Sequence, residues 1–255
     1  MSEGTAKKIQ LLTERLAEKI LKSATPVPGF ILGVSGTDSL AALDILVQAV
    51  CLSGQKIPIH AVHYVTSTRA VARSDSFRNA GVPWIMERYW HAVKTTVAKP
   101  WGCNQDPQRW ADLHLRALNS FGAEDEDGHS VRTLPEGKNF WVSGTMNATE
   151  WELGTYSMLS TAVSLQPIRS LWKTEVLQLC ADIGVPQCVM EAARIPDCWC
   201  GRDEIAAENI ELVDKILQHR VDPREVSAEL LAAVMQWVGE TKRANAFKRR
   251  VPFVV

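Results

Sequence analysis

The chain has 255 residues, of which 46% are hydrophobic and 22% charged, and this composition excludes a protein that is disordered along its whole length. The 28 Lys and Arg residues nearly balance the 29 Asp and Glu residues, so the net charge of −1 argues against a protein that holds a long nucleic acid by charge alone. No apolar run approaches the ~18 residues that a membrane span needs, and no apolar leader follows Lys7 and Lys8. We therefore expect a cytoplasmic protein that contacts no membrane and keeps its six cysteines reduced.

The first part of the chain alternates helical and extended patterns. Apolar residues spaced three and four apart predict a helix over 5–23, which Pro26 and Pro28 end. The apolar run at 30–34 predicts a buried parallel strand. The elements expected next are a buried helix over 40–52, a strand over 57–64, a helix over 68–80, a strand over 82–89 and a helix over 107–121.

The second part of the chain is richer in helices. An acidic stretch at 122–138 without periodicity predicts a surface loop, and a fourth strand is expected at 140–143. Strands that alternate with helices predict an α/β fold with a doubly wound parallel sheet. We divide the chain into an N-terminal helix at 1–28 and a single domain at 29–255 with a helical C-terminal part from about 200. After the fourth strand we expect one helix that starts at about 146. Three more helices are expected over 172–182, 203–218 and 223–238.

A small polar turn, Ser35-Gly36-Thr37-Asp38-Ser39, separates the first strand from the next helix. Such a turn exposes backbone N–H groups at a helix N-terminus, and with the hydroxyls of Ser35 and Ser39 they form a site for an anion. Asp38 does not suit a bare phosphate, but it suits a phosphate that is bridged by Mg²⁺. Taken alone, the turn is equally consistent with Ser39 or Asp38 acting only as a helix cap.

The turn resembles the pyrophosphate loop of the ATP pyrophosphatases (PP-loop enzymes), whose usual form is S-G-G-x-D-S. Those enzymes cleave ATP between the α- and β-phosphates and adenylate a substrate oxygen. The resemblance implies the fold of the adenine nucleotide α-hydrolases and ATP binding by Ser35, Gly36, Thr37, Asp38 and Ser39. Because SGTDS is one residue shorter than the usual form, we expect pyrophosphate in the same place with altered backbone geometry.

Two longer segments make the resemblance more specific. WVSGTMNATEWELGTYSMLS and QPIRSLWKTEVLQLCADIGVP are similar to the second half of ammonia-dependent NAD synthetase, and IPDCWCGRDE and FKRRVP resemble its C-terminal region. This resemblance implies that Thr145 lies near ATP, that Glu150 and Asp38 bind Mg²⁺, that Lys173 reaches the phosphates and that the protein is a homodimer. In isolation Glu150 and Lys173 would be interpreted as solvated helix charges, but the loop favours a functional role.

One segment departs from the NAD synthetases. Between Gly154 and Pro167 those enzymes carry a Gly- and Asp-rich loop that faces the dinucleotide substrate. Here the sequence is TYSMLSTAVSLQ, which is one residue shorter and has neither an acid nor a glycine. The departure favours an acceptor other than nicotinate adenine dinucleotide.

Three cysteines suggest sulfur chemistry. Cys103, followed by Asn104 just before the helix at 107–121, resembles the first catalytic cysteine of the tRNA 2-thiouridylases, which are also PP-loop enzymes. Cys198 and Cys200 lie about a hundred residues further on, where those enzymes hold a second cysteine. A thiol near a helix N-terminus has a lowered pKa, and two such thiols can pass sulfur as a persulfide and a disulfide. A zinc site built from these three cysteines and a histidine is a competing interpretation, which the lack of a CxxC pair disfavours.

For several other residues the sequence predicts a purely structural role or leaves a structural and a functional role open. Cys51 and Cys180 fall on apolar helix faces and are predicted to be inert core residues. Arg109 and Arg116 lie seven apart on one helix face, where they meet either an anionic group or solvent. The basic cluster at 248–250 either closes over phosphates or is a solvated tail.

These patterns predict an ATP- and Mg²⁺-dependent sulfurtransferase. It would adenylate a carbonyl oxygen of a small heterocyclic acceptor, such as the purine guanine, and replace that oxygen with sulfur carried by Cys103 as a persulfide. AMP and pyrophosphate would leave, a sulfur donor or a sulfur-relay protein would reload the enzyme, and nucleic acid is not an expected partner. Two alternatives stay open, namely an NAD synthetase-like amidating ligase that uses ammonia and an inactive nucleotide-binding subunit.

Overall fold

A parallel sheet lies at the centre of the protein. The computed structural model describes residues 1–65, 71–98, 106–119, 139–193 and 204–249. Within these residues the sheet has four strands in the order β3-β2-β1-β4, and all three strand pairs are parallel. The strands are β1 (Phe30–Gly33), β2 (Ile59–Tyr64), β3 (Val93–Ala98) and β4 (Trp141–Val142). The predicted α/β fold with a doubly wound parallel sheet is confirmed.

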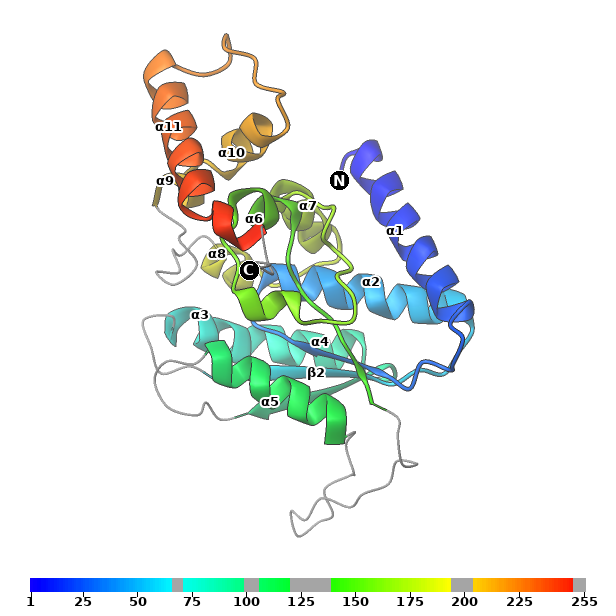
Figure 1. Cartoon of the computed structure of the whole chain (residues 1–255). Helices are drawn as coiled ribbons and strands as arrows, with labels where there is room; N and C mark the ends of the chain where they lie inside the picture. The colour runs from blue at the N-terminus through cyan, green and yellow to red at the C-terminus, as the bar shows by residue number, and fades with distance from the viewer. Residues whose placement is uncertain (66–70, 99–105, 120–138, 194–203, 250–255) are drawn as a thin grey trace, which may run out of the picture.

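Helices surround the sheet (Figure 1). None of the helices in the described ranges combines the length and the apolar character that crossing a bilayer requires. Short turns of other helix types lie at Phe77–Gly81, Met158–Thr161 and Ala246–Arg249. The α-helices are α1 (Glu3–Leu21), α2 (Thr37–Ser53), α3 (Val71–Ser76), α4 (Val82–Arg88), α5 (Asp106–Asn119), α6 (Ala148–Leu153), α7 (Lys173–Asp182), α8 (Gln187–Ala192), α9 (Glu204–Glu208), α10 (Ile210–Leu217) and α11 (Ala228–Ala244).

The two faces of the sheet are covered unequally. On one face α1, α2, α4, α7 and α8 contribute to a single large cluster of buried apolar side chains, and α2 is buried over most of its length, as its uniformly apolar sequence predicts. Helix α5 lies on the other face (Figure 1). There Leu113 and Ala117 share a second buried cluster with Ile31 and Val62. A further cluster joins α6 to α9, α10 and α11. Burial on both faces explains the continuous apolar sequence of β1, whereas the middle of the edge strand β3 is polar and partly exposed.

Strand order places the loop after β1 beside the segment after β4. The chain runs from β1 outward through β2 to β3 and then returns to β4 on the opposite side of β1. In an open parallel sheet this reversal leaves a crevice at the carboxyl ends of the two strands that flank it. Ser35–Ser39 and Thr145–Asn147 therefore lie at one end of the sheet although about a hundred residues separate them.

Some predicted elements are corrected by the structure. The strand expected over 82–89 is wrong, because Val82–Arg88 forms helix α4 and the third strand is Val93–Ala98. Val82, Ile85 and Tyr89 are buried at spacings of three and four, which is the helical period and was present in the sequence. The helix expected over 203–218 is two helices, α9 and α10, that are separated at Asn209. The predicted loop at 122–138 lies outside the described residues.

A buried histidine in strand β2 makes the stability of the fold depend on pH. His60 is 2% exposed, its Nε2 lies 2.8 Å from the Thr96 hydroxyl, and burial lowers its pKa to about 4 from 6.5, with Lys94 and Arg116 acting in the same direction. The unfolded chain takes up a proton on His60 near pH 6.5 and the folded chain does so only near pH 4, so stability is full above pH 6.5 and is lost as the pH falls.

We expect His60 to lower the free energy of unfolding by about 2 kcal/mol between about pH 7 and pH 5. Urea unfolding of the wild type and of His60→Gln at the two pH values measures this loss. The variant should lose less stability than the wild type on acidification. An equally steep loss in both proteins would show that other groups carry the pH dependence.

Candidate functional site

The loop after β1 is closed by the side chain of Ser39. Its Oγ accepts hydrogen bonds from the backbone N–H groups of Ser35 (3.0 Å) and Gly36 (3.2 Å) and donates one to the Gly36 carbonyl (2.7 Å). Ser39 is 4% exposed, so its hydroxyl shapes the loop from within. The side chain of Ser35 is exposed, and a Cβ added to Gly36 would meet no atom within 4 Å, so this side of the loop faces open space.

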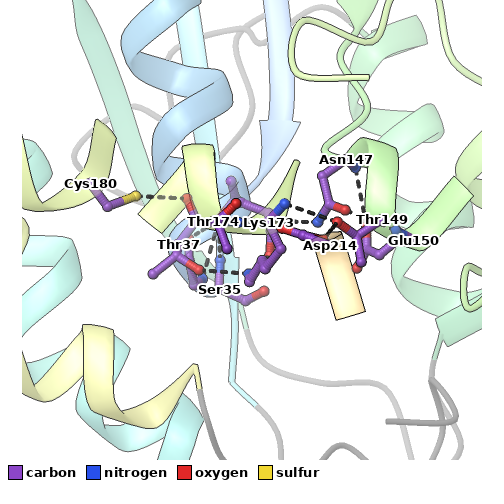
Figure 2. Close-up of polar contacts among 12 residues, drawn as sticks. Ser35, Thr37, Asn147, Thr149, Glu150, Lys173, Thr174, Cys180 and Asp214 are labelled. Atoms are coloured by element: carbon purple, nitrogen blue, oxygen red, sulfur yellow. Dashed lines mark hydrogen bonds and ion pairs between the residues drawn. The ribbon is translucent and has the colours of Figure 1, made fainter. Parts of the chain in front are cut away.

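Thr37, Asn147 and Lys173, from three distant parts of the chain, lie together in a polar cluster (Figure 2). Asp38 is the centre of this cluster. Lys173, the first residue of α7, places its Nζ 2.5 Å from Asp38 Oδ2 and donates a hydrogen bond to the Thr37 hydroxyl at 3.0 Å. Asn147 donates from Nδ2 to Asp38 Oδ1 at 2.8 Å. The side chains of Lys173 and Asp38 are only 6% and 18% exposed, so water screens this ion pair weakly. The structure thus brings together Thr37, Asp38 and Lys173, three of the residues that the sequence predicted to bind ATP or Mg²⁺.

Glu150 is linked to Asp38 through Asn147, which contacts both residues. Its Oε2 accepts the Asn147 N–H at 3.3 Å, and Asn147 Oδ1 accepts the Glu150 N–H at 2.9 Å, which is a reciprocal cap at the N-terminus of α6. Asn147 therefore contacts both carboxylates that were predicted to bind Mg²⁺, one through its side-chain amide and one through its backbone. Two carboxylates completed by phosphate oxygens and water are a donor set that suits Mg²⁺. Among the described residues no group of three or more acidic, histidine or cysteine side chains forms a metal site on its own.

A pocket of about 170 Å³ opens beside the loop on the side of α5, and we call it the α5 pocket. Ser35 and Thr145, both predicted to bind ATP, lie in its wall with Arg109. Arg116 pairs instead with Asp112 on its own helix at 2.5 Å. The pocket is lined by Gly33, Val34, Ser35, Tyr64, Arg109, Trp110, Leu113, Ser143 and Thr145.

The sequence analysis missed Asn147, which is fully buried and holds Asp38. A local signal was present, because Asn147 followed three residues later by Glu150 is the pattern of a helix cap. Its bond to Asp38 spans 109 positions and could not be inferred from spacing. Thr149 and Asp214 were missed for the same reason, since their 2.5 Å hydrogen bond joins α6 to α10.

The predicted sulfur-carrying residues cannot be placed. Cys103, Cys198 and Cys200 lie outside the described residues. Cys180 is buried as predicted, its Sγ donates to the Thr37 carbonyl at 3.2 Å, and burial raises the pKa of its thiol to about 12. The prediction that Cys51 is a core residue is wrong, because Cys51 is exposed near the end of α2.

The basic cluster near the C-terminus has a structural role at Lys248. Its Nζ donates hydrogen bonds to the carbonyls of Gly154 and Tyr156, both at 2.8 Å, just after α6 ends. Arg249 lies 3.6 Å from Glu152. These contacts attach the end of the described chain to α6, as cations at a helix C-terminus do.

Comparison with known proteins relates part of the chain to one protein family. Residues 134–252 match the family model described as NAD synthase. The NH3-dependent NAD⁺ synthetase of Trichlorobacter lovleyi is 38% identical over 121 residues, which cover 44% of this chain and 44% of that protein. The matched segment thus spans less than half the length of this relative. The corresponding enzyme of Thermococcus kodakarensis is 25% identical over 258 residues, covering 96% of this chain and 94% of that protein.

A solved structure with a similar fold is NMN synthetase from Francisella tularensis. Its TM-score is 0.61 at 18% identity, with 97% of this chain and 98% of that chain covered. At that identity the likeness concerns the fold alone. The chain is therefore similar to the NAD synthetases in sequence over residues 134–252, and its overall fold is similar to that of NMN synthetase.

Proposed function

We propose that the protein is an ATP-dependent ligase that adenylates an oxygen of a small-molecule acceptor and releases pyrophosphate. The observation that carries this proposal is the Asp38–Lys173–Asn147 cluster at the N-terminus of α2, where the loop after β1 ends. An ammonium and a carboxylate held together at a helix N-terminus suit a polyanion and its counter-ion. The relatives are named as NAD⁺ synthetases, and the same first step is expected of this chain.

Each residue of the cluster has a role in this proposal. Lys173 exchanges its contact with Asp38 for a phosphate oxygen when ATP binds, and Asn147 keeps Asp38 oriented during the exchange. Asp38 and Glu150 would hold Mg²⁺, which supplies charge neutralisation for the departing pyrophosphate. Ser39 keeps the loop in its compact shape, and the exposed Ser35 and the Thr145 side chain contact the nucleotide.

The α5 pocket is where we place the acceptor and the nucleoside. Its wall combines the aromatic rings of Tyr64 and Trp110 with the guanidinium of Arg109. Planar heterocycles stack on such rings, and a guanidinium binds carboxylate or phosphate groups. This chemistry favours a small aromatic acceptor over a nucleic acid.

For the second step we propose sulfur transfer through Cys103. One observation favours it, namely that α5 begins three residues after Cys103 and carries two pocket-lining residues, Arg109 and Trp110, in its first half. A persulfide on Cys103 would displace AMP from the adenylated carbon, and the Cys200 or Cys198 thiolate would then release the thiolated product and leave a disulfide. A persulfide donor reloads Cys103, and a thiol reductant opens the disulfide.

Ammonia is the alternative nucleophile, and the relatives' names favour it. An assay supplied with nicotinate adenine dinucleotide, ammonia, ATP and Mg²⁺ distinguishes amidation from sulfur transfer as the second step. Because residues 155–166 lack the acids and glycines of the family's substrate loop, we expect little or no NAD to form. The measurement is NAD formation followed by an enzyme-coupled assay, and robust production would assign the protein to amidation and end the sulfur proposal.

Release of pyrophosphate would exclude the alternative that the protein is an inactive nucleotide-binding subunit. The experiment incubates the protein with ATP, Mg²⁺ and a panel of purines and carboxylic acids and identifies products by mass spectrometry. Pyrophosphate that appears with one acceptor supports the proposed ligase, and its absence with every acceptor would support the inactive alternative. The predicted homodimer is tested by light scattering of the same preparation.

Gly36→Ala tests whether the open side of the loop holds phosphate. Gly36 has an extended backbone with φ 177°, which any residue adopts, and its added Cβ has free space, so the fold should be unchanged. If phosphates lie there, we expect the methyl group to weaken Mg·ATP binding about tenfold or more, measured by calorimetry. Gly239→Ala is the matched control, because its added Cβ also meets nothing within 4 Å and Gly239 lies in α11, outside the loop and the α5 pocket. Equal affinity in Gly36→Ala and the wild type would contradict the phosphate position.

A further inference from the structure

The N-terminus of α7 is held by side chains from two other helices. Lys173 donates its backbone N–H to the Thr149 hydroxyl of α6 at 2.9 Å. Thr174 donates its backbone N–H to Asp214 Oδ2 of α10 at 2.8 Å. Both amides belong to the first turn of α7, where no intrahelical acceptor exists. These contacts therefore fix the residue from which the Lys173 side chain extends to the loop.

Thr149 and Asp214 are also bonded to each other. The Thr149 hydroxyl, which accepts from Lys173, donates its own proton to Asp214 Oδ1 at 2.5 Å (Figure 2). Asp214 is 1% exposed and Thr149 3% exposed, so water does not compete for these bonds. Burial raises the pKa of Asp214 because it disfavours the charged carboxylate, and the hydrogen bonds from Thr149 and Thr174 act in the opposite direction. A continuous chain of hydrogen bonds thus runs from α10 through α6 to the backbone of Lys173.

We propose that Thr149 and Asp214 are positioning residues that set where Lys173 places its ammonium. The ion pair between Lys173 and Asp38 depends on the position of the Lys173 backbone, because the buried side chain has little freedom to compensate. Loss of the Thr149 hydroxyl leaves the Lys173 N–H without its acceptor and Asp214 without one donor. The C-terminal helices are in this way coupled to the PP-loop. The effect on ATP rests on the proposed function, whereas the effect on the Lys173 ammonium does not.

The first measurement is independent of ATP. Lys173 is 5% exposed, and its rate of acylation by an N-hydroxysuccinimide ester is followed by peptide mass spectrometry in the folded protein. Thr149→Val keeps the shape and removes the hydroxyl, so we expect labelling of Lys173 to accelerate at least about fivefold. Thr149→Ser keeps the hydroxyl and should stay within about twofold of the wild type.

The second measurement is the affinity for Mg·ATP by calorimetry. We expect Thr149→Val to bind about tenfold more weakly than the wild type and Thr149→Ser to restore the affinity. If the wild type itself binds no ATP, the proposed function fails, and the labelling result still decides whether Lys173 is positioned in this way.

Asp214→Asn is the second variant, used also if Thr149→Val does not fold. It is isosteric but turns one acceptor into a donor facing the Thr149 hydroxyl, so it should expose Lys173 to labelling as well. Asp44→Asn is the matched control, because Asp44 is a buried carboxylate at 2% exposure that pairs with Tyr89 away from the loop. Unchanged Lys173 labelling in a folded Thr149→Val or Asp214→Asn protein would overturn the proposal. Equal acceleration in Asp44→Asn would also overturn it, because general loosening would then explain the effect.

Discussion

Asp38→Asn is expected to lower Mg²⁺-dependent pyrophosphate release by about 10²–10³-fold while the protein stays folded. The substitution is isosteric and removes the charge that would bind Mg²⁺. It also sets an amide against the Lys173 ammonium, which now lies 2.5 Å from Asp38 Oδ2. We therefore expect a loss of about 1–3 kcal/mol in the free energy of unfolding as well. Pyrophosphate release and thermal unfolding, measured on one preparation, separate the two effects.

Two further variants are needed to interpret the result for Asp38→Asn. Glu150→Gln should also impair pyrophosphate release if Glu150 binds Mg²⁺, although the amide can still accept the Asn147 N–H and preserve the cap. Asp182→Asn is the control, because Asp182 is an exposed carboxylate at the end of α7 that pairs with the N-terminal amine. Normal pyrophosphate release by Asp38→Asn would mean that Asp38 serves only to hold Lys173 and Asn147.

Cys103→Ser is expected to abolish formation of a thiolated product while ATP binding is retained. Serine keeps the size and polarity of cysteine, but a hydroxyl has no accessible anion near neutral pH and cannot carry a persulfide. Intact-protein mass after loading with a persulfide donor should therefore rise by one sulfur atom in the wild type and not in Cys103→Ser. Full thiolation activity in the variant would end the sulfur proposal.

Cys51→Ser and Cys188→Ser are the controls for this experiment, because both thiols are exposed and neither belongs to the proposed site. Both variants should load sulfur at Cys103 as the wild type does. Cys200→Ser, or else Cys198→Ser, should stop after one turnover if that thiol releases the product, which product counting per enzyme molecule detects. Multiple turnovers in both variants would mean that neither Cys198 nor Cys200 is needed to release the product and that an external thiol releases it from Cys103.

The sequence by itself determined the fold class and pointed to the Ser35–Ser39 turn and Lys173, although it did not point to Asn147. Apolar strands that alternate with helices dictate a parallel sheet, because such strands are stable only when both faces are covered. Ser35–Ser39 could be placed because a polar turn between a buried strand and a buried helix is a local pattern. The same local reasoning failed at 82–89, where the short apolar run fitted either a strand or a helix until its packing partners were known.

Tertiary structure alone decided which polar groups meet. Asp38, Asn147 and Lys173 come from three segments, and the reversal of strand order between β1 and β4 brings the first two to one end of the sheet. The Ser39 hydroxyl accepts from two loop amides, which is the helix-cap alternative that the isolated motif had left open. Asp214 gave no local signal, because a carboxylate at 1% exposure is stabilised only by donors from helices that are distant in sequence. Local patterns therefore specify elements, whereas buried polar contacts depend on how those elements pack.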